Sequence, residues 1–482
     1  AESTDNDLVI KEQIRVNNST GDITYSDKDS LTVIDVTDVM YQGALQAEND
    51  KTITISNVGT VNIGTAENRL EGAAIHAQSG FVDIKAIDDV NIYAGNNGIL
   101  GQYASEKNAV NIEAGGNITI DSDAYAVMAA TMTNGEGTAT VNISAGDKVI
   151  INSKEYAVSV YDQDKNTPDW AGENAAKAVI NGKNGVVINS ATSAIYMNRS
   201  HSANDGILSI TSEAGDVVIE SAQDAIIMKK ADGLDGSLLD ADIIGKNVSI
   251  ASENGLAVKA QNGSLNVKAD NIVDYNGGVW VEGDTVLETE AETVNFIGGD
   301  NNGALIKSGN LTVDAKNINF YSTGVSSTGL RVQGSNGSAT LNAENINVTA
   351  KRYGVLALND GKISIATDNL VVDVTDESDG RAIFAQGGTD YETAPENAAA
   401  IEINAENIVV NSPKIGIGAF SNSQMNINGN LTVNAANAID VRGNSTVNIN
   451  TDSKHSTVLN GDIVFETPAS PGDSQNSGHI IN

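Results

Sequence analysis

Carboxylates are the most abundant chemically active groups in this sequence. The 482 residues include 63 Asp and Glu against 28 Lys and Arg. Glycoside hydrolysis needs two carboxylates about 5–10 Å apart on either side of a bound sugar. The neighbouring acids Asp88–Asp89 and Asp373–Asp376 could supply such a pair. Neither pair is accompanied by a basic or aromatic constellation, so the sequence predicts no catalytic residues.

Other catalytic and metal chemistry has few candidate groups. The chain has no Cys, which excludes disulfides, thiolate zinc sites and Cys nucleophiles. Its four His (His76, His201, His455 and His479) are far apart in the sequence, and no Gly-x-Ser-x-Gly motif is present. We therefore predict a protein that is not an enzyme, with no metal site and no cofactor.

The charge balance excludes two classes of partner. The formal net charge is −35. Phosphate contacts need clustered Lys and Arg, so nucleic-acid binding is not expected, and anionic membrane surfaces are disfavoured for the same reason. No run of about 18 apolar residues is present, so this segment is not expected to insert into a membrane.

Short apolar–polar–apolar triplets recur along the chain and predict the elements that would position any site. The triplet Val-Asn-Ile occurs at 61–63, 90–92, 110–112 and 141–143. Alternation of period two is typical of a strand with one buried face. The triplets come in groups of three, and successive groups begin about 28 residues apart, a spacing typical of solenoids.

Three short strands per coil predict an all-β fold, namely a right-handed parallel β-helix of about 15 three-stranded coils. We expect residues 1–50 to form an N-terminal cap and a first coil, residues 51–465 to form the β-helix, and residues 466–482 to be a C-terminal linker or boundary. A cap is expected because an open coil exposes unpaired edge groups.

An asparagine recurs at the turn between the first and second strands of the repeat, in Ala-x-x-Asn or a close relative. The positions are Asn117, Asn247, Asn271, Asn317, Asn345, Asn369, Asn407 and Asn430. The Asn amide can bond to the same amide in the coils above and below, so we predict an Asn ladder. The alternative is glycosylation, because Asn117, Asn310, Asn347 and Asn430 are among the Asn that begin formal sequons in these strand patterns.

The third strand of the repeat differs from the other two in its outward residues. First and second strands place mostly Asn, Thr, Asp and Glu outward, whereas the third reads small–apolar–variable–apolar. If the apolar residue after the small one faces inward, the variable residue faces outward. The predicted outward column is Gln46, His76, Leu100, Met128, Ser159, Tyr196, Ile227, Ala257, Trp280, Ile306, Arg331, Leu356, Phe384, Gly418 and Asp440.

Large apolar residues dominate the middle of this column and make it a candidate binding surface. Soluble monomers rarely leave a long apolar strip exposed. The residues predicted to bind are Leu100, Met128, Tyr196, Ile227, Trp280, Ile306, Leu356 and Phe384. The alternative is that loops fold over the column and bury it as a second small core, and both outcomes can hold on different coils.

Insertions concentrate after the third strand, at 129–140, 160–177, 197–207, 229–237 and 386–400. Insertions on one side of a repeat often mark the binding face. Aromatic rings beside carboxylates can hold sugars or cationic groups. The loop residues predicted to bind on this basis are Tyr161, Asp164, Trp170, Asp390 and Tyr391. The alternative for either loop is a solvated loop with an anchoring aromatic residue.

The triplets, the acidic Asn/Gly/Thr-rich composition, the absence of Cys and the third-strand column together resemble the passenger domains of bacterial autotransporter (type V) adhesins. The greatest similarity is to the self-associating, AIDA-like group, over roughly residues 20–465. The resemblance implies an extracellular protein of the Gram-negative cell surface, exported through a C-terminal outer-membrane barrel that lies outside this sequence.

The same resemblance implies the function. Such a protein would mediate bacterial adhesion, aggregation or biofilm formation, by homotypic association with a second copy or by binding a host or microbial surface ligand such as a glycan or matrix protein. The alternative is a glycan-binding or polysaccharide-degrading β-helix protein, because this fold often carries polysaccharide lyases and hydrolases.

Overall fold

The computed structural model is built of β-strands joined by bends and turns. It describes residues 2–4, 7–36, 43–102, 109–131, 138–162, 174–199, 204–230, 239–388, 398–450 and 454–466. The described residues form 41 strands and no helix. Parallel pairing predominates, with an antiparallel pair formed by β1 (Glu2–Thr4) and β2 (Asp7–Ile10). The predicted parallel β-helix is confirmed, while its right-handed winding stays a prediction.

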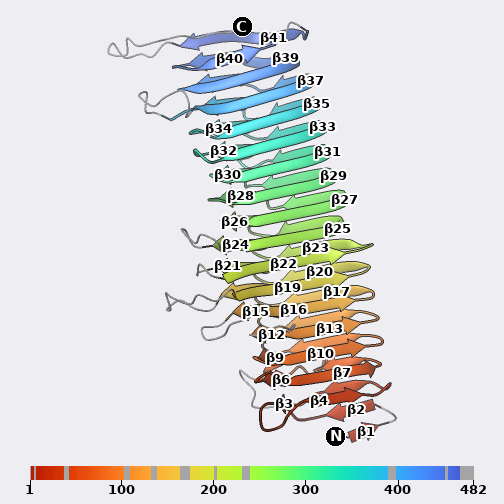
Figure 1. The fold of residues 1–482 in the computed structure, drawn as a ribbon. Helices are drawn as coiled ribbons and strands as arrows, with labels where there is room; N and C mark the ends of the chain where they lie inside the picture. The colour runs from red at the N-terminus through yellow and green to blue at the C-terminus, as the bar shows by residue number, and fades with distance from the viewer. Residues whose placement is uncertain are drawn as a thin grey trace. The chain divides into compact units, whose positions relative to one another are not determined.

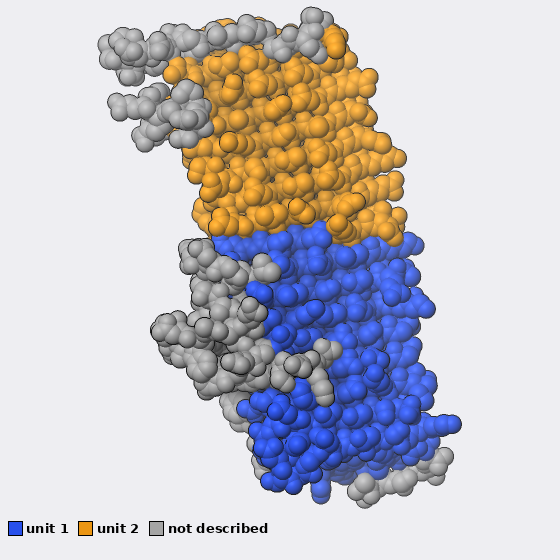
Figure 2. Space-filling model, viewed as in Figure 1, with its two compact units in different colours: residues 1–255, 262–266 blue, residues 256–261, 267–482 orange. Residues whose placement is uncertain are grey.

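The chain divides into two compact units. Unit 1 comprises residues 1–255 and 262–266, and unit 2 comprises residues 256–261 and 267–482 (Figure 2). Within each unit the chain returns to the same face in every coil, so that equivalent strands stack on one another (Figure 1). The predicted linker at 466–482 lies outside the described residues, apart from Glu466 at the end of the last strand.

Unit 1 has three separate strands in each coil except the last, whose first and second strands are joined in β25 (Leu239–Ser252). The first strands are β4 (Ile23–Ser26), β7 (Thr52–Val58), β10 (Phe81–Ala86), β13 (Val110–Ala114), β16 (Thr138–Ala145), β19 (Asn174–Gly182), β22 (Asn204–Ser212) and the first part of β25 (Leu239–Ser252). The second strands are β2, β5 (Leu31–Val33), β8 (Val61–Ile63), β11 (Val90–Ala94), β14 (Ile118–Ser122), β17 (Lys148–Ser153), β20 (Gly185–Ser190), β23 (Asp216–Ser221) and the last part of β25. The third strands are β3 (Ile14–Val16), β6 (Gly43–Glu48), β9 (Ala73–Gln78), β12 (Ile99–Gln102), β15 (Val127–Thr131), β18 (Val158–Asp162), β21 (Ile195–Arg199) and β24 (Ile226–Lys230).

Unit 2 merges the first and second strands of most coils into one long strand, and β39 (Ser423–Arg442) also contains the third strand of its coil, because its residues 437–442 pair with β38 (Ile415–Phe420). The merged strands are β27 (Ser264–Asn276, of which 264–266 belong to unit 1), β29 (Val286–Gly299), β31 (Asn310–Ser322), β33 (Ser338–Ala350), β35 (Lys362–Val374), β37 (Ala399–Asn411) and β39 (Ser423–Arg442). The third strands are β26 (Val258–Gln261), β28 (Val279–Glu282), β30 (Ala304–Lys307), β32 (Thr328–Gln333), β34 (Tyr353–Leu358), β36 (Arg381–Gln386) and β38 (Ile415–Phe420). The last strands are β40 (Thr446–Ile449) and β41 (Thr457–Glu466).

The interior of unit 1 consists of aligned columns of branched side chains. Parallel pairing places Ile55, Ile84, Ile112, Ile143 and Ile180 in register on successive first strands. All five side chains are buried. A register slip of one residue would turn the whole column outward, so the alternating pattern specifies this register strongly.

The interior of unit 2 contains a stack of aromatic rings. The ring centroids of Tyr275 and Phe296 are 5.1 Å apart, and those of Phe296 and Phe320 are 4.7 Å apart. The Tyr275 hydroxyl lies 2.7 Å from Thr289 Oγ1, which satisfies its hydrogen bonding inside the core. Burial raises the pKa of Tyr275 well above its usual range, so this phenol stays neutral.

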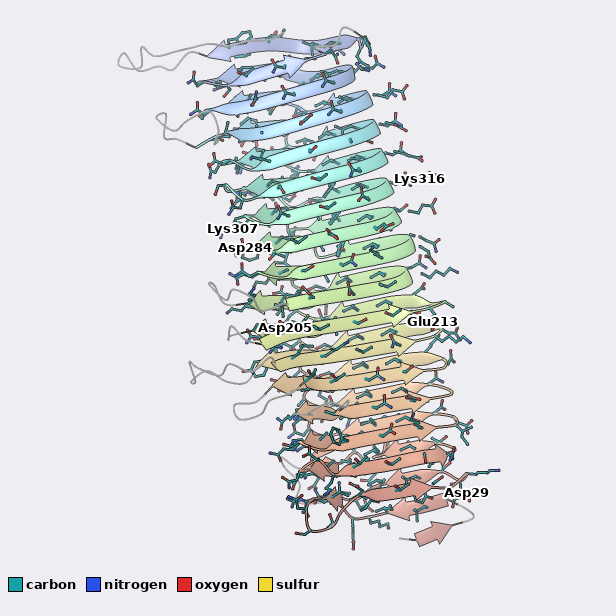
Figure 3. The ribbon with its side chains drawn as sticks, in the orientation of Figure 1. Asp29, Asp205, Glu213, Asp284, Lys307 and Lys316 are labelled. Atoms are coloured by element: carbon teal, nitrogen blue, oxygen red, sulfur yellow. The ribbon has the colours of Figure 1, made fainter. Side chains whose placement is uncertain are left out.

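The corner between the first and second strands is built differently in the two units. In unit 1 it contains glycines that allow the turns to stack closely, since a Cβ on Gly115 would lie 2.1 Å from the carbonyl oxygen of Ile87. In unit 2 the backbone stays extended through the corner and exposes charged side chains. Figure 3 shows Glu213 of unit 1 and Lys316 of unit 2 projecting outward from their respective corners.

Four of the eight Asn predicted to form a ladder do so at the unit 2 corner. Asn117 and Asn430 instead accept hydrogen bonds from the backbone N–H groups of Lys148 and Ser456. The side-chain amide of Asn345 donates to Asn317 at 3.0 Å, Asn369 donates to Asn345 at 3.0 Å, and Asn407 donates to Asn369 at 3.0 Å. The Asn247 amide of unit 1 donates to a carboxylate instead, that of Asp216, at 2.7 Å. The ladder therefore ties consecutive coils together along one edge of unit 2.

Candidate functional site

The outward column of the third strands follows the predicted register throughout unit 1. Cα pairing aligns the seven predicted residues one per coil. They are Gln46, His76, Leu100, Met128, Ser159, Tyr196 and Ile227. The small–apolar–variable pattern thus identified the correct face of these strands.

Two positions of the predicted column in unit 2 are wrong. Ile306 pairs with the inward-facing Val332 and is fully buried, whereas Leu305 pairs with Arg331 and takes the outward place. Lys259 pairs with Trp280 and takes the place predicted for Ala257, which is also fully buried. Leu305 and Ile306 are both apolar, so alternation could not decide which of them faces inward.

A groove of about 810 Å³ lies on the third-strand side of unit 1. This volume is in the range of small-molecule sites. We term it the third-strand groove. Its lining residues are Arg15, Gln46, Glu48, His76, Gln78, Asn97, Leu100, Gln102, Tyr125, Met128, Tyr156, Ser159, Tyr161 and Tyr196.

Tyrosines form one end of the groove. The ring centroids of Tyr125 and Tyr156 are 5.6 Å apart, those of Tyr156 and Tyr196 are 4.7 Å apart, and Tyr161 lies 6.4 Å from Tyr196 at a tilt. The stacked rings cover part of one another's faces. The buried Ser159 sits in register beside Tyr196 and leaves room for this cluster.

Two phenols of this cluster, those of Tyr125 and Tyr196, have a raised pKa and are uncharged at neutral pH. Burial, and then the Glu155 carboxylate, raises the pKa of Tyr125. Burial, followed by the neighbouring phenols, raises the pKa of Tyr196. An uncharged phenol can both donate and accept a hydrogen bond, so these hydroxyls suit a polar, uncharged ligand.

Amides and one ion pair form the other end of the groove. Arg15 Nη2 donates to both oxygens of Glu48, at 2.8 and 3.0 Å, and Gln46 Nε2 donates to Glu48 Oε1 at 2.5 Å. His76 Nε2 lies 3.0 Å from Gln102 Oε1. The Glu48 charge is therefore balanced within the groove, and the rest of this end is lined by neutral amides and an imidazole.

Two predicted binding residues of unit 2 face outward but are not accessible. Leu356 is 3% exposed and Phe384 is 1% exposed. The Arg381 guanidinium lies 4.6 Å from the centroid of the Phe384 ring, and the Phe420 ring meets it edge-on at 4.8 Å. The prediction of an exposed contact surface is wrong for these positions, because side chains of the same face cover them.

The remaining predicted residues differ in position. Leu100, Met128, Tyr196 and the loop residue Tyr161 line the groove, where Leu100 is buried, with 8% of its surface exposed. Ile227 continues the column one coil beyond Tyr196 and is partly exposed. Trp280 of unit 2 is partly exposed, with Lys259 Nζ 5.3 Å from its ring centroid. Asp164, Trp170, Asp390 and Tyr391 lie outside the described residues.

Several lining residues were missed by the sequence reasoning. Tyr125 and Tyr156 occupy the turn just before the third strand in consecutive coils, in the similar segments 124–127 (Ala-Tyr-Ala-Val) and 155–158 (Glu-Tyr-Ala-Val). The repetition of a tyrosine at this position could have predicted that the two rings lie next to each other. Gln78 and Gln102 follow the predicted column by two residues on their strands, and Cα pairing puts them in register. Outward residues two apart share a face, so this second column was also predictable.

The acidic pairs considered for catalysis have structural partners. Asp89 Oδ1 accepts a hydrogen bond from the backbone N–H of Asn117 at 2.6 Å. Asp373 Oδ1 accepts from the Asn411 amide at 2.6 Å, and Asp376 Oδ1 accepts from the backbone N–H of Ser378 at 2.8 Å.

Within the described part of the chain, no group of three or more His, Asp or Glu could hold a metal ion. The same residues include no helix with the length and apolar character needed to cross a membrane.

Comparison of the chain with protein-family models, with curated proteins and with solved structures finds no match.

Proposed function

We propose that this chain is a non-enzymatic, surface-exposed adhesin of a Gram-negative bacterium, similar to the AIDA-like autotransporter passenger domains. It would bind a surface ligand through the third-strand groove of unit 1 and so promote attachment, aggregation or biofilm formation. The observation that carries the proposal is the groove itself, because it gathers six of the predicted column residues, three of them predicted to bind, and a predicted loop tyrosine into one concavity of about 810 Å³.

The lining of the groove favours binding over catalysis. Glu48 is the single carboxylate among its described lining residues, and it is engaged by Arg15 at 2.8 Å. Hydrolysis of a glycosidic bond needs a second carboxylate across the sugar. Aromatic rings, amides and a thioether instead provide a mixed polar and apolar contact surface, which is typical of recognition sites.

Display on the surface of a non-adherent bacterial strain tests the proposal. Attachment to host cells and cell clumping are both measured, for the wild-type chain and for the double variant Tyr156→Ala/Tyr196→Ala. We expect whichever of the two activities the wild type confers to fall about tenfold, since truncation of central aromatic residues commonly costs more than about 1–2 kcal/mol of binding.

A matched control separates the groove from general surface effects. Tyr321 is a half-exposed tyrosine on a second-strand face of unit 2, far in sequence from the groove residues. Tyr321→Ala should leave attachment and clumping unchanged. If the groove variant is displayed and folded by circular dichroism yet adheres as the wild type does, the groove is not the adhesive site.

A further inference from the structure

We infer that the third-strand groove binds a linear, uncharged oligosaccharide that lies lengthwise across successive coils. This inference rests on the proposed adhesive function and names the ligand class of that site. Three properties of the groove carry it: its elongation, the hydrogen-bonding character of its lining and its balance of charge.

The groove is elongated along the stack of third strands. Its lining residues come from consecutive strands, from Arg15 on β3 to Tyr196 on β21. Six successive strand pairings join these two ends. At about 4.8 Å per strand, the groove extends about 29 Å. A site of this length fits an extended polymer segment better than a single compact molecule.

The polar groups of the lining can both donate and accept hydrogen bonds. Within the described part of the chain, no hydrogen bond engages the phenol hydroxyls of Tyr156 and Tyr196 or the side-chain amide of Gln78. Hydroxyls and amides each combine donor and acceptor capacity. Sugar hydroxyls have the same dual capacity, so a saccharide can pair with such groups in many orientations. Leu100 and Met128 lie between the two polar ends and would contact the apolar C–H faces of sugar rings.

Charge favours a neutral saccharide over an anionic one. Among the described lining residues, Arg15 is the single Lys or Arg, and it is paired with Glu48 at 2.8 Å. The chain as a whole carries a formal net charge of −35. A polyanionic glycan would therefore be repelled at long range and would find no unpaired Lys or Arg among the described lining residues.

An extended peptide is the main competing occupant, and the floor of the groove disfavours it. Peptides bound along sheets gain most of their affinity by adding a strand to an open edge. The strands β9, β12, β15 and β18 pair with neighbours on both sides. Their backbone groups are already used, so a peptide would have to bind through side chains alone.

Calorimetric titration of the purified chain tests this inference. The neutral probes are cellohexaose, maltohexaose and chitohexaose. An oligogalacturonate hexamer, a glucosamine hexamer and an uncharged octapeptide of alternating Ser and Asn probe the competing classes. We expect at least one neutral hexasaccharide to bind, and to bind about tenfold more tightly than its disaccharide because the site spans several sugar residues.

Variants locate the binding. Tyr196→Ala should weaken hexasaccharide binding about tenfold. Tyr196→Phe, which keeps the ring and its packing, and Gln78→Ala should each weaken it about threefold by removing a hydrogen bond. Tyr321→Ala should leave it within twofold, and thermal melting confirms that each variant is folded.

Three results would overturn the inference: no neutral hexasaccharide binds, a charged saccharide or the peptide binds more tightly than all of them, or binding survives Tyr196→Ala and Tyr196→Phe unchanged. Failure of the inference is distinguishable from failure of the proposed function. Loss of adhesion in the groove variant without any neutral-sugar binding refutes the ligand class alone, whereas full adhesion by that variant refutes the adhesive role of the groove.

Discussion

At the residue scale, the direction of a side chain and its accessibility are separate properties. Phe384 faces outward by register but is 1% exposed. The neighbouring Gly418 allows this, because a Cβ at that position would lie 2.5 Å from Phe384 Cδ2. The ring rests over the glycine and beneath the Arg381 guanidinium. The absence of a side chain on the glycine of one coil thus allows the aromatic ring of the preceding coil to pack flat and be buried.

Gly418→Ala should destabilise unit 2 by about 1–3 kcal/mol, because the new methyl group displaces the Phe384 ring and overpacks the cluster. Urea unfolding followed by circular dichroism measures the change. Gly388→Ala is the matched control, since nothing lies within 4 Å of a Cβ at that position. Equal stability of the two variants would contradict the packing of Phe384 over Gly418.

Asp379 joins two arginines on the third-strand side of unit 2. Arg352 Nη2 donates to Asp379 Oδ2 at 2.5 Å, and Arg381 Nη2 donates to Asp379 Oδ1 at 2.8 Å. Partial burial alone would raise the pKa of Asp379, but the hydrogen bonds and charges of the two arginines outweigh it and lower that pKa.

A lowered pKa in the folded state makes the contribution of Asp379 to stability dependent on pH. It is present in full above the unfolded-state pKa of about 3.9 and is lost as the pH falls through the lower folded-state pKa. Asp379→Asn should therefore be less stable than wild type at pH 7, with a difference that shrinks as the pH falls below about 4. Unfolding midpoints at several pH values measure this, and a difference independent of pH would contradict it.

At the element scale, the two units hold neighbouring coils together differently at the corner between the first and second strands. Unit 2 uses the Asn ladder, whereas unit 1 uses closely stacked, glycine-containing turns. The extended corner of unit 2 leaves its outward side chains in register, so Asn317, Asn345, Asn369 and Asn407 hydrogen-bond from coil to coil. Each inner member both donates and accepts. The ladder therefore couples neighbouring coils at the point where the chain changes direction.

Asn345→Ala should lower the free energy of unfolding of unit 2 by about 1–3 kcal/mol, because two ladder hydrogen bonds are lost and the amides of two neighbours lose a partner. Chemical denaturation measures the change. Asn336 is exposed in a turn of the same unit, so Asn336→Ala is the control and should change stability by less than about 0.5 kcal/mol. An equal effect of both variants would show that the ladder does not stabilise the fold.

At the scale of the whole molecule, the net charge opposes close contact between copies. The formal net charge of −35 gives repulsion between chains at low ionic strength. Salt screens it, with a Debye length of about 30 Å at 0.01 M and about 8 Å at 0.15 M. Any homotypic contact must overcome this repulsion.

Raising NaCl from about 10 to 150 mM should therefore reduce the repulsion between copies. Static light scattering of the purified chain measures this as a fall in the second virial coefficient. The uncharged solute sucrose, added to the same osmolality, controls for osmotic effects and should leave the coefficient nearly unchanged. A coefficient that is insensitive to salt would contradict electrostatic control of association.

The sequence by itself determined the fold class, the strand triplets, the Asn ladder and the outward column of unit 1. These follow from period-two alternation and a recurring turn residue, which act within one coil and its neighbours. The same logic failed at Ile306, because Leu305 is also apolar and local alternation cannot choose between them.

Tertiary structure alone decided which outward residues are accessible and which gather into a site. The burial of Phe384 depends on Gly418 and Arg381, and the tyrosine cluster joins Tyr125, Tyr156 and Tyr196 from three coils. Stacking converts a separation of about 30 residues in sequence into a neighbouring strand about 4.8 Å away. Whether an outward residue is accessible depends on the size of the side chains in the adjacent coils. The apolar pattern of a single coil carries no information about those side chains.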